Sequence, residues 1–361
     1  MYNEIFIKDF STLGEVISEH IEDANHNSLL DKAIEDSARE NPFFTRYMQI
    51  EALRAISHNF IEEGMLREWL ALERRVLDNM VTGVSAGCPE RADDYCKNVG
   101  IITAGNIPLV GFHDFLCVLA VGYRAIVKPS SKDRYLIVAL AEILIGINSY
   151  WKDRIEFVAK LPEDIDMVIA SGRSETMEMI KESYRVVPLL LRGSRFSVAV
   201  IRSDEDDDSL RRLGRDIFLY FGFGCRNVSL LLAPENYDFE KIANLIGSYR
   251  ELTDISDYRA AYRYAKAQAI MGRERFIDGG FYILKEEETL PPPLAVIGIK
   301  YYRNSADIEQ FIELNEGRLQ CIVNYKNRGR VIGFGETQQP LLNDYADGVD
   351  TIGVINSVKT R

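Results

Sequence analysis

Cys225 is the residue whose type and context best suit nucleophilic chemistry. It follows Gly222 and Gly224, which allow the backbone to turn sharply and a substrate carbonyl to approach closely. Arg226 is the next residue, and a neighbouring cation favours the thiolate, which is the nucleophilic form of cysteine. A free cysteine is also commonly a small buried hydrophobic residue, so this segment alone leaves both roles open for Cys225.

The other cysteines have an ordinary context. Cys117 lies in an apolar stretch and Cys321 opens a predicted strand, so we expect structural roles for them, as for Cys88 and Cys96. The odd total of 5, the wide spacing and the lack of a Cys-x-x-Cys pair indicate a reducing, cytoplasmic compartment without a disulfide framework. We expect no metal site, because ligand-like spacing is missing among the histidines: His20, His26, His58 and His113.

Asn106 lies in the string Ile101-Ile-Thr-Ala-Gly-Asn-Ile-Pro-Leu109, between a predicted strand and a predicted helix. A carboxamide on such a turn can donate a hydrogen bond to a developing oxyanion. The same side chain can instead satisfy its own turn, which is a common arrangement. The segment alone favours this second interpretation.

Lys128 ends a predicted buried strand and is followed by Pro129, Ser130 and Ser131. An ammonium group beside hydroxyls suits an anionic phosphate of a cofactor, although a solvated strand end explains the same residues equally well. The ordinary dinucleotide fingerprint Gly-x-Gly-x-x-Gly and the Walker motif are both absent from the sequence.

The composition is that of an acidic, folded chain. With 361 residues the length corresponds to about two or three domains, and 47% hydrophobic residues are enough to form their cores. The formal net charge of −12 argues against a nucleic-acid or anionic-membrane partner. The first ten residues contain no continuous apolar segment typical of an export signal, and the most apolar stretch, Leu136–Ile147, is too short to span a bilayer.

The candidate residues need elements that bring them together. From about Asp9 to Met80 the pattern is helical, with Met65, Trp69, Leu72 and Val76 predicted to share one face. This segment carries no convergent polar groups, so we interpret it as a helical scaffold.

Beyond this scaffold, strands alternate with helices, which predicts a parallel, doubly wound sheet. In such sheets ligands bind at the carboxyl ends of the strands, where the turns at Asn106, Lys128-Pro129 and Ser171-Gly172 would lie. We expect strands at 99–103, 125–128, 155–158 and 167–170, and helices at 110–121 and 134–147.

A second run of strands and helices is predicted from Phe196 onward. The acidic stretch 204–208 is expected to begin a helix, because negative charge stabilises the positive end of a helix dipole. That helix leads directly into the segment of Cys225, and its apolar stripe consists of Leu210, Leu213, Ile217, Phe218 and Phe221. Further strands are expected at 196–201, 295–299 and 351–355, and a helix at about 306–315.

Taken together, these motifs resemble the aldehyde dehydrogenase superfamily in order and spacing, and most closely its fatty acyl-CoA reductase branch, the LuxC-type family. The motifs are Asn106-Ile-Pro108, Lys128-Pro-Ser130, Ser171-Gly-Arg173 and Gly224-Cys225. The strings Thr-Ala-Gly-Asn and Phe-Gly-x-Gly-Cys-Arg-Asn look like the reductase branch specifically. The resemblance covers most of the chain and implies an α/β, aldehyde dehydrogenase-like fold, with two doubly wound parallel-sheet domains and an N-terminal helical segment.

The resemblance also implies a role for each motif. Cys225 would be the nucleophile, and the Asn106 side chain would hold the oxyanion together with the backbone N–H of Cys225. The implied reaction reduces a fatty acyl-CoA through a thioacyl-enzyme to the aldehyde, with NADPH or NADH as hydride donor and release of coenzyme A. The cofactor-binding residues would be Thr103, Lys128, Pro129, Ser130, Ser171, Gly172 and Arg173.

The sequence departs from the superfamily pattern at three places. Oxidising members carry Glu-Leu-Gly-Gly-Lys, whose glutamate activates the deacylating water, whereas this chain has Leu191-Arg-Gly-Ser-Arg195. An enzyme without that base cannot readily hydrolyse its thioacyl intermediate, which suits a reductase. The Glu-x-Phe-Gly-Pro string that usually holds the cofactor ribose is missing, with 292–298 near its place. Arg173 replaces the usual serine and could pair with a phosphate or lie on the surface.

Alternatives to acyl-CoA reduction stay open from the sequence. The acyl donor could be an acyl phosphate or an acyl-protein, and an acyl-transferring protein could be a partner. The chain could also be a noncatalytic partner that binds acyl groups or cofactor. We expect an N-terminal helical segment at 1–82, a nicotinamide-cofactor domain at 83–190 and a catalytic domain at 191–361. By analogy with the superfamily we expect a homo-oligomer.

Overall fold

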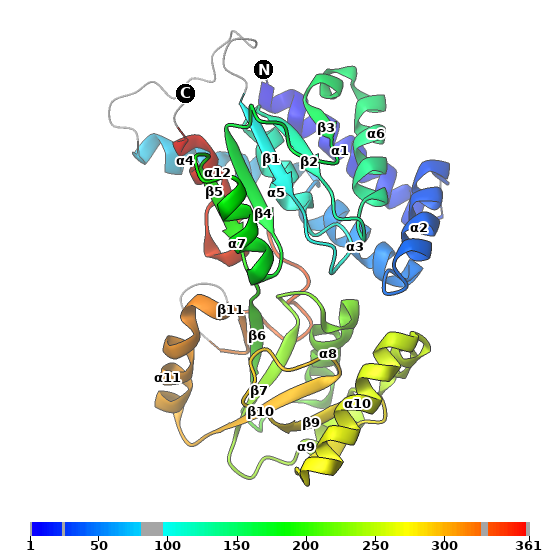
Figure 1. Cartoon of the computed structure of the whole chain (residues 1–361), viewed down its shortest axis with the longest axis vertical. Coiled ribbons are helices and arrows are strands. Elements are labelled where there is room, and N and C mark those ends of the chain that lie inside the picture. Colours follow the sequence, from blue (N-terminus) through cyan, green and yellow to red (C-terminus); the bar gives the residue numbers. More distant parts are fainter. Residues whose placement is uncertain (1, 24–25, 81–96, 326–330, 359–361) are drawn as a thin grey trace. The chain divides into compact units, whose positions relative to one another are not determined.

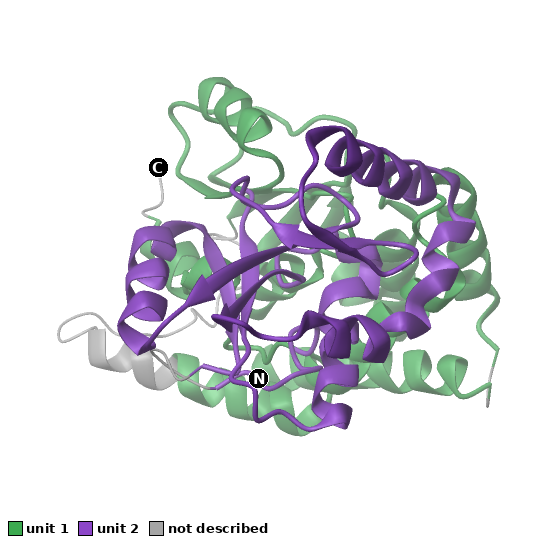
Figure 2. Cartoon of the chain, turned by 90° about the horizontal axis from the view of Figure 1, so that it is seen from below, with its two compact units in different colours: residues 1–193, 340–361 green, residues 194–339 purple. Residues whose placement is uncertain are grey.

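The computed structural model describes residues 2–23, 26–80, 97–325 and 331–358. Cys88 and Cys96 therefore lie outside the described residues. Contacts within the chain divide it into two compact units, residues 1–193 with 340–361 and residues 194–339 (Figure 2). Each unit has its own sheet, and we describe the units separately.

Unit 1 begins with four helices, in the segment that the sequence predicts to be helical. They are α1 (Tyr2–Ile21), α2 (Ser28–Glu40), α3 (Arg46–Asn59) and α4 (Glu63–Met80) (Figure 1). Asn27 caps α2 and Thr45 caps α3 by accepting hydrogen bonds from the first-turn N–H groups. The buried face of α1 repeats at helical spacing and packs into the core of unit 1 through Phe6, Phe10, Leu13 and Ile17.

The predicted buried face of α4 is wrong in part. Trp69 is buried, but Met65 and Leu72 are 38% and 39% exposed. The helix is rotated so that Glu73 also faces the interior, where it accepts a hydrogen bond from the hydroxyl of Tyr345, which accepts one from the Trp69 indole. These hydrogen bonds join α4 to the C-terminal segment, and the spacing of hydrophobic residues within α4 cannot predict such a long-range contact.

The sheet of unit 1 has five parallel strands in the order β3-β2-β1-β4-β5. The chain runs outward from β1 to β3 and then returns to the other side of β1 with β4. The switch point of the topology therefore lies between β1 and β4, where ligands bind in doubly wound sheets. The elements are β1 (Asn98–Ile102), α5 (Phe112–Ala120), β2 (Arg124–Lys128), α6 (Tyr135–Ile147), β3 (Ile155–Phe157), β4 (Met167–Ser171), α7 (Ser174–Ser183) and β5 (Leu189–Arg192).

Unit 2 has a six-stranded sheet in the order β11-β6-β7-β10-β9-β8. Its pairings are parallel except for β8 with β9, which is antiparallel. The strands are β6 (Phe196–Val200), β7 (Val228–Pro234), β8 (Phe276–Asp278), β9 (Ile283–Glu286), β10 (Val296–Tyr302) and β11 (Leu319–Val323). The helices are α8 (Asp207–Phe218), α9 (Phe239–Leu245), α10 (Ser256–Gly272) and α11 (Ser305–Asn315). The predicted α/β class with parallel sheets and N-terminal helices is confirmed.

The last predicted strand, at 351–355, is wrong, because these residues form helix α12 (Thr351–Ser357). Asp350 accepts a hydrogen bond from the N–H of Gly353 and so caps the helix. Ile352 and Ile355, three residues apart, are buried. A short apolar run does not distinguish a strand from a buried helix by periodicity, whereas the capping aspartate does indicate a helix start.

A buried ion pair joins the C-terminal segment to the sheet of unit 1. The Arg192 guanidinium at the end of β5 lies 2.9 Å from the Asp114 carboxylate of α5, and their side chains are 6% and 8% exposed. Arg192 also donates to the Thr351 hydroxyl and to the Ala346 carbonyl oxygen. The guanidinium therefore connects β5, α5 and the C-terminal segment.

Replacing Arg192 by alanine is expected to lower the free energy of unfolding by about 3 to 5 kcal/mol, because Asp114 is left as an unpaired buried charge. Chemical denaturation measures this loss. Arg185→Ala is the matched control, since it removes an exposed ion pair with Glu182 that is worth about 0 to 1 kcal/mol. Equal losses in the two variants would contradict the stabilising role of Arg192.

Candidate active site

The cysteine segment of unit 2 lies between α8 and β7, where the chain makes a left-handed turn. Tyr220, Phe221 and Gly222 have φ values of 55°, 57° and 75°. Such values cost a residue with a side chain about 1 to 2 kcal/mol, so other contacts must hold Tyr220 and Phe221, whose side chains are both buried. These residues interrupt the right-handed helical backbone just before Cys225.

Cys225 is partly exposed, whereas Cys117 and Cys321 are buried. Burial raises the pKa of the Cys117 thiol well above its usual value, which disfavours its nucleophilic form. Among the cysteines in the described part of the chain, Cys225 is the one that a substrate can reach without opening the core.

The backbone around Cys225 is fixed on both sides. The Ser197 hydroxyl donates to the carbonyl oxygen of Cys225 over 2.8 Å, and the same hydroxyl oxygen accepts the N–H of Cys321. The N–H of Gly224 donates to the Asn227 side-chain oxygen over 2.8 Å. The Nε of Arg226 donates to the Thr337 carbonyl oxygen over 2.6 Å. Cys225 therefore stands on a rigid segment.

In unit 1, the turns after β1 and β2 are bonded to one another. The hydroxyl oxygen of Thr103 accepts the N–H of Ser130 over 3.1 Å, and the N–H of Thr103 donates to the carbonyl oxygen of Lys128. A Cβ atom on Gly105 would lie 2.3 Å from the Ser130 hydroxyl oxygen, so only glycine allows this approach. Asn106 is exposed on the first turn.

The third predicted turn follows β4, which pairs with β1 on the side opposite β2. Ser171 ends β4, and Arg173 is exposed at the start of α7. The carboxyl ends of β2, β1 and β4 thus bring Lys128 and Ser130, then Asn106, then Ser171 to one edge of the sheet. Asn106 belongs to unit 1 and Cys225 to unit 2, and each is placed within its own unit.

The groups at this edge suit an anionic dinucleotide. Lys128 offers an ammonium group, Ser130 and Ser171 offer hydroxyls, and the first turn of α7 offers backbone N–H groups. Thr103 is buried and its hydroxyl already bonds Ser130, so its contribution is to hold the turn. The set of donors therefore suits the phosphate groups of an anionic ligand.

Asp133 is a site residue that the sequence analysis missed. It is 3% exposed, its carboxylate accepts the N–H of Leu109 over 2.9 Å, and its own N–H donates to the Ser130 carbonyl oxygen. Leu109 has a φ of 59°, so the carboxylate stabilises a strained residue of the Asn106 turn. Asp133 thus connects the Asn106 turn, through its side chain, with the Ser130 turn, through its backbone N–H. The sequence signal that could have identified Asp133 is its place between the strand that ends at Lys128 and the apolar helix α6.

Burial raises the pKa of Asp133 to about 7, despite the hydrogen bonds from Leu109 and Val110 that lower it. The folded protein therefore binds this proton more tightly than the unfolded chain. The stabilisation associated with the bound proton is complete below about pH 4 and is lost as the pH rises through about 7. Burial also raises the pKa of Asp216 to about 6. The stabilisation from its bound proton is therefore also lost as the pH rises, at a lower pH than for Asp133.

Asp133→Asn is therefore expected to change how stability depends on pH. Between pH 6 and pH 7 the wild-type protein should lose about 1 kcal/mol relative to the variant, because asparagine has no proton to release. Denaturant unfolding at the two pH values measures the difference. Asp153→Asn, at an exposed position, is the control. If the difference in unfolding free energy between the wild-type protein and Asp133→Asn did not change with pH, it would contradict the raised pKa of the Asp133 carboxyl group.

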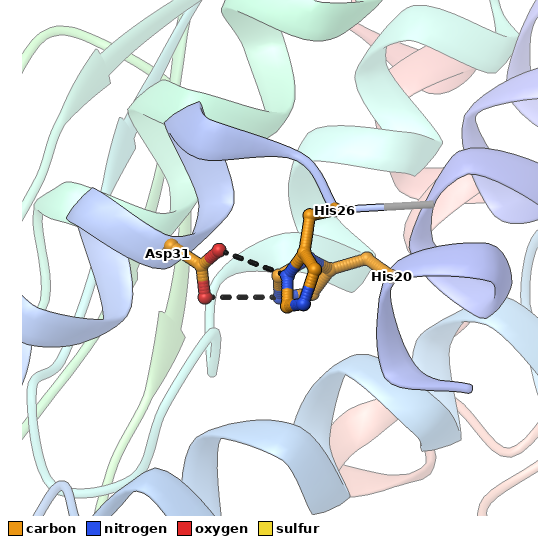
Figure 3. A group of neighbouring side chains, drawn as sticks. All are labelled: His20, His26 and Asp31. Atoms are coloured by element: carbon orange, nitrogen blue, oxygen red, sulfur yellow. Dashed lines mark ion pairs between the residues drawn. The ribbon is translucent and has the colours of Figure 1, made fainter. Parts of the chain in front are cut away.

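His20, His26 and Asp31 form a separate group of potential metal ligands between α1 and α2, with ligand atoms within 4.8 Å of one another (Figure 3). Two contacts oppose a metal ion there. Arg46 already pairs with Asp31 over 3.2 Å. The Nδ1 of His20 accepts the N–H of Asn27, which leaves the proton of the neutral ring on Nε2, the atom that faces Asp31.

Comparison with known proteins identifies the family. The family model described as "Acyl-CoA reductase (LuxC)" matches residues 48–251, more than half of the chain. The comparison with curated proteins returned no match. Within the described residues, no helix is long and apolar enough to cross a membrane.

Solved structures of aldehyde dehydrogenases have a similar fold. An NAD-dependent enzyme from Sinorhizobium meliloti matches with a TM-score of 0.62 and 12% identity over 94% of this chain and 81% of that chain. An enzyme from Mycobacterium tuberculosis complexed with NAD+ matches with a TM-score of 0.58 and 15% identity over 91% and 78%. One from Bartonella henselae matches with a TM-score of 0.58 and 13% identity over 95% and 85%. The chain has the aldehyde dehydrogenase fold and belongs to the LuxC acyl-CoA reductase family.

Proposed function

We propose that the protein reduces a fatty acyl-CoA to the aldehyde through a thioester on Cys225, with NADPH as the hydride donor. The family match over 48–251 carries this proposal, because it spans the motifs of Asn106, Lys128 and Cys225. The partial exposure of Cys225 on a rigid segment supports its assignment as the nucleophile.

The chain's own residues perform the acyl transfer in this proposal. The Cys225 thiolate attacks the thioester carbon, forming a carbon–sulfur bond while the carbonyl electrons move to oxygen. The Asn106 amide and the backbone N–H of Cys225 donate hydrogen bonds to that oxyanion. The oxyanion then collapses, the bond to coenzyme A breaks, and the leaving thiolate takes up a proton from solvent.

The cofactor is held at the carboxyl edge of the first sheet in this proposal. Lys128 and Ser130 would bind the ribose or its 2′-phosphate, and the Ser171-Gly172 turn with Arg173 would bind the pyrophosphate at the start of α7. Thr103 and Pro129 shape the turns that carry these groups. A bound cofactor would supply a hydride to the carbonyl carbon of the enzyme thioester, and breakage of the carbon–sulfur bond would then release the aldehyde and return the Cys225 thiolate.

The segment 191–195 supports reduction over hydrolysis. Where oxidising aldehyde dehydrogenases have a glutamate, this chain has no carboxylate, and Arg192 is held in the buried pair with Asp114. No side chain of this segment can serve as a base for water. The thioester then persists until hydride transfer. A reducing, cytoplasmic compartment suits the reaction, because the Cys225 thiol must stay unoxidised.

A side-by-side assay of donors and cofactors tests this function. Oxidation of NADPH and of NADH is followed with acyl-CoAs of graded chain length, with an acyl phosphate and with an acyl-protein thioester. We expect acyl-CoA with NADPH to give the highest kcat/KM. Turnover confined to an acyl phosphate or acyl-protein would replace the proposed donor, and binding without turnover of any donor would identify a noncatalytic partner.

A further inference from the structure

Asn227 occupies a buried position two residues after Cys225. It is 2% exposed, and its side chain has four hydrogen-bond partners. The two N–H bonds of the amide nitrogen serve three carbonyl oxygens, those of Asp216 at 3.0 Å, Ile217 at 3.3 Å and Leu219 at 2.8 Å, so one N–H is shared between two of them. The amide oxygen accepts the N–H of Gly224 at 2.8 Å.

These partners lie on both sides of the left-handed turn. The carbonyl groups belong to the last turn of α8 and to Leu219. Because the helix ends here, these carbonyl oxygens lack the N–H groups that would follow in a longer helix. Gly224 follows the strained residues Tyr220 and Phe221. The Asn227 side chain therefore links the backbone before the turn to the backbone after it. Its hydrogen bonds offset part of the strain of the left-handed residues in the turn.

This link determines where Cys225 stands. Asn227 fixes the N–H of the preceding residue, Gly224, while Ser197 fixes the carbonyl oxygen of Cys225 itself. The peptide unit between Gly224 and Cys225, which carries the N–H assigned to the oxyanion, is held between these two anchors. Acyl transfer is sensitive to such placement, since a shift of about 1 Å can cost about 100-fold in rate.

We infer that Asn227 is a positioning residue for acyl transfer, which aligns the Cys225 thiol and its backbone N–H on one carbonyl group. The inference rests on the proposed function of Cys225. Asn227 acts through the backbone of the turn and contacts neither substrate nor cofactor in this role.

The test compares two reactions of the same thiol in the full-length protein. Acylation by a fatty acyl-CoA passes through an oxyanion and needs the Cys225 thiol and its backbone N–H to be aligned. Alkylation by iodoacetamide displaces iodide and forms no oxyanion. In Asn227→Ala we expect the acylation rate constant to fall about 10 to 100-fold and the alkylation rate constant to stay within about threefold. Rates are expressed per folded protein, measured by circular dichroism.

Two further variants keep the test decisive. Asn324→Ala is the control, because it removes another unit 2 carboxamide, which donates to the Val200 carbonyl oxygen and to Glu205, and it should leave the ratio of the two rates unchanged. Asn227→Ser retains a small polar group and should show a milder selective loss, so it decides the question if Asn227→Ala does not fold.

The outcomes separate this inference from the proposed function. Acylation and alkylation that fall together, or do not fall, in a folded variant overturn the positioning role while the wild-type protein still becomes acylated. A wild-type protein that is alkylated at Cys225 but never acylated by acyl-CoA, acyl phosphate or acyl-protein overturns the proposed function and the inference with it.

Discussion

Cys225→Ala is expected to abolish reduction of acyl-CoA. The alanine side chain offers no atom that can form the covalent acyl intermediate, so hydride transfer has no enzyme-bound thioester to act on. NADPH oxidation and aldehyde release should both fall to the level of the uncatalysed reaction. This expectation rests on the partial exposure of Cys225 and on two backbone hydrogen bonds, one from Ser197 to the Cys225 carbonyl oxygen and one from the Gly224 N–H to Asn227.

The matched control for this variant is Cys321→Ala. Cys321 is buried in β11, and its backbone N–H, which bonds Ser197, is retained on substitution. This control should keep the reductase activity with at most a modest loss of stability. Turnover by Cys225→Ala, measured after contaminating enzyme has been excluded, would remove the nucleophile assignment.

Asn106→Ala is expected to slow acylation by about 100 to 1,000-fold without eliminating it. Loss of one oxyanion donor typically costs this much, and the backbone N–H of Cys225 would still be present. Single-turnover measurement of acyl-enzyme formation reports the step directly, independently of cofactor binding and product release.

Asn106→Asp distinguishes the two roles that the sequence leaves open for this residue. An aspartate keeps a side-chain oxygen that can satisfy the local turn but removes the N–H that donates to an oxyanion. As an oxyanion donor, Asn106 should tolerate aspartate no better than alanine, because a negative charge near the developing oxyanion is repulsive. Recovery of activity in Asn106→Asp would establish that the residue only supports its turn.

The sequence predicts much of the architecture because its strong patterns are local. The buried strands at Val99 and Ala125 are short apolar runs between turn residues, and they form β1 and β2 as expected. The helix start at Asp206 has both the acidic run and the capping geometry. Cys117 is buried in an apolar helix, as its neighbours predict.

The errors and omissions arise from tertiary contacts. The orientation of α4 follows the polar chain from Trp69 to Glu73, which depends on Tyr345, more than 270 residues away along the chain. The positions of Asp133 and Asn227 depend on backbone groups of strained turns, and neither residue belongs to a periodic pattern. Gly222 is the one residue of the left-handed turn that indicates it in the sequence, because aromatic residues such as Tyr220 and Phe221 rarely adopt a positive φ.

The most direct measurement of the central claim is a single-turnover experiment with radiolabelled acyl-CoA. After mixing with the wild-type protein without cofactor, one label per active site should be found on the peptide that contains Cys225. Adding NADPH should release that label as aldehyde, whereas water alone should leave it in place. Label that never attaches to Cys225, or that leaves as free acid at the same rate with and without NADPH, would contradict the account.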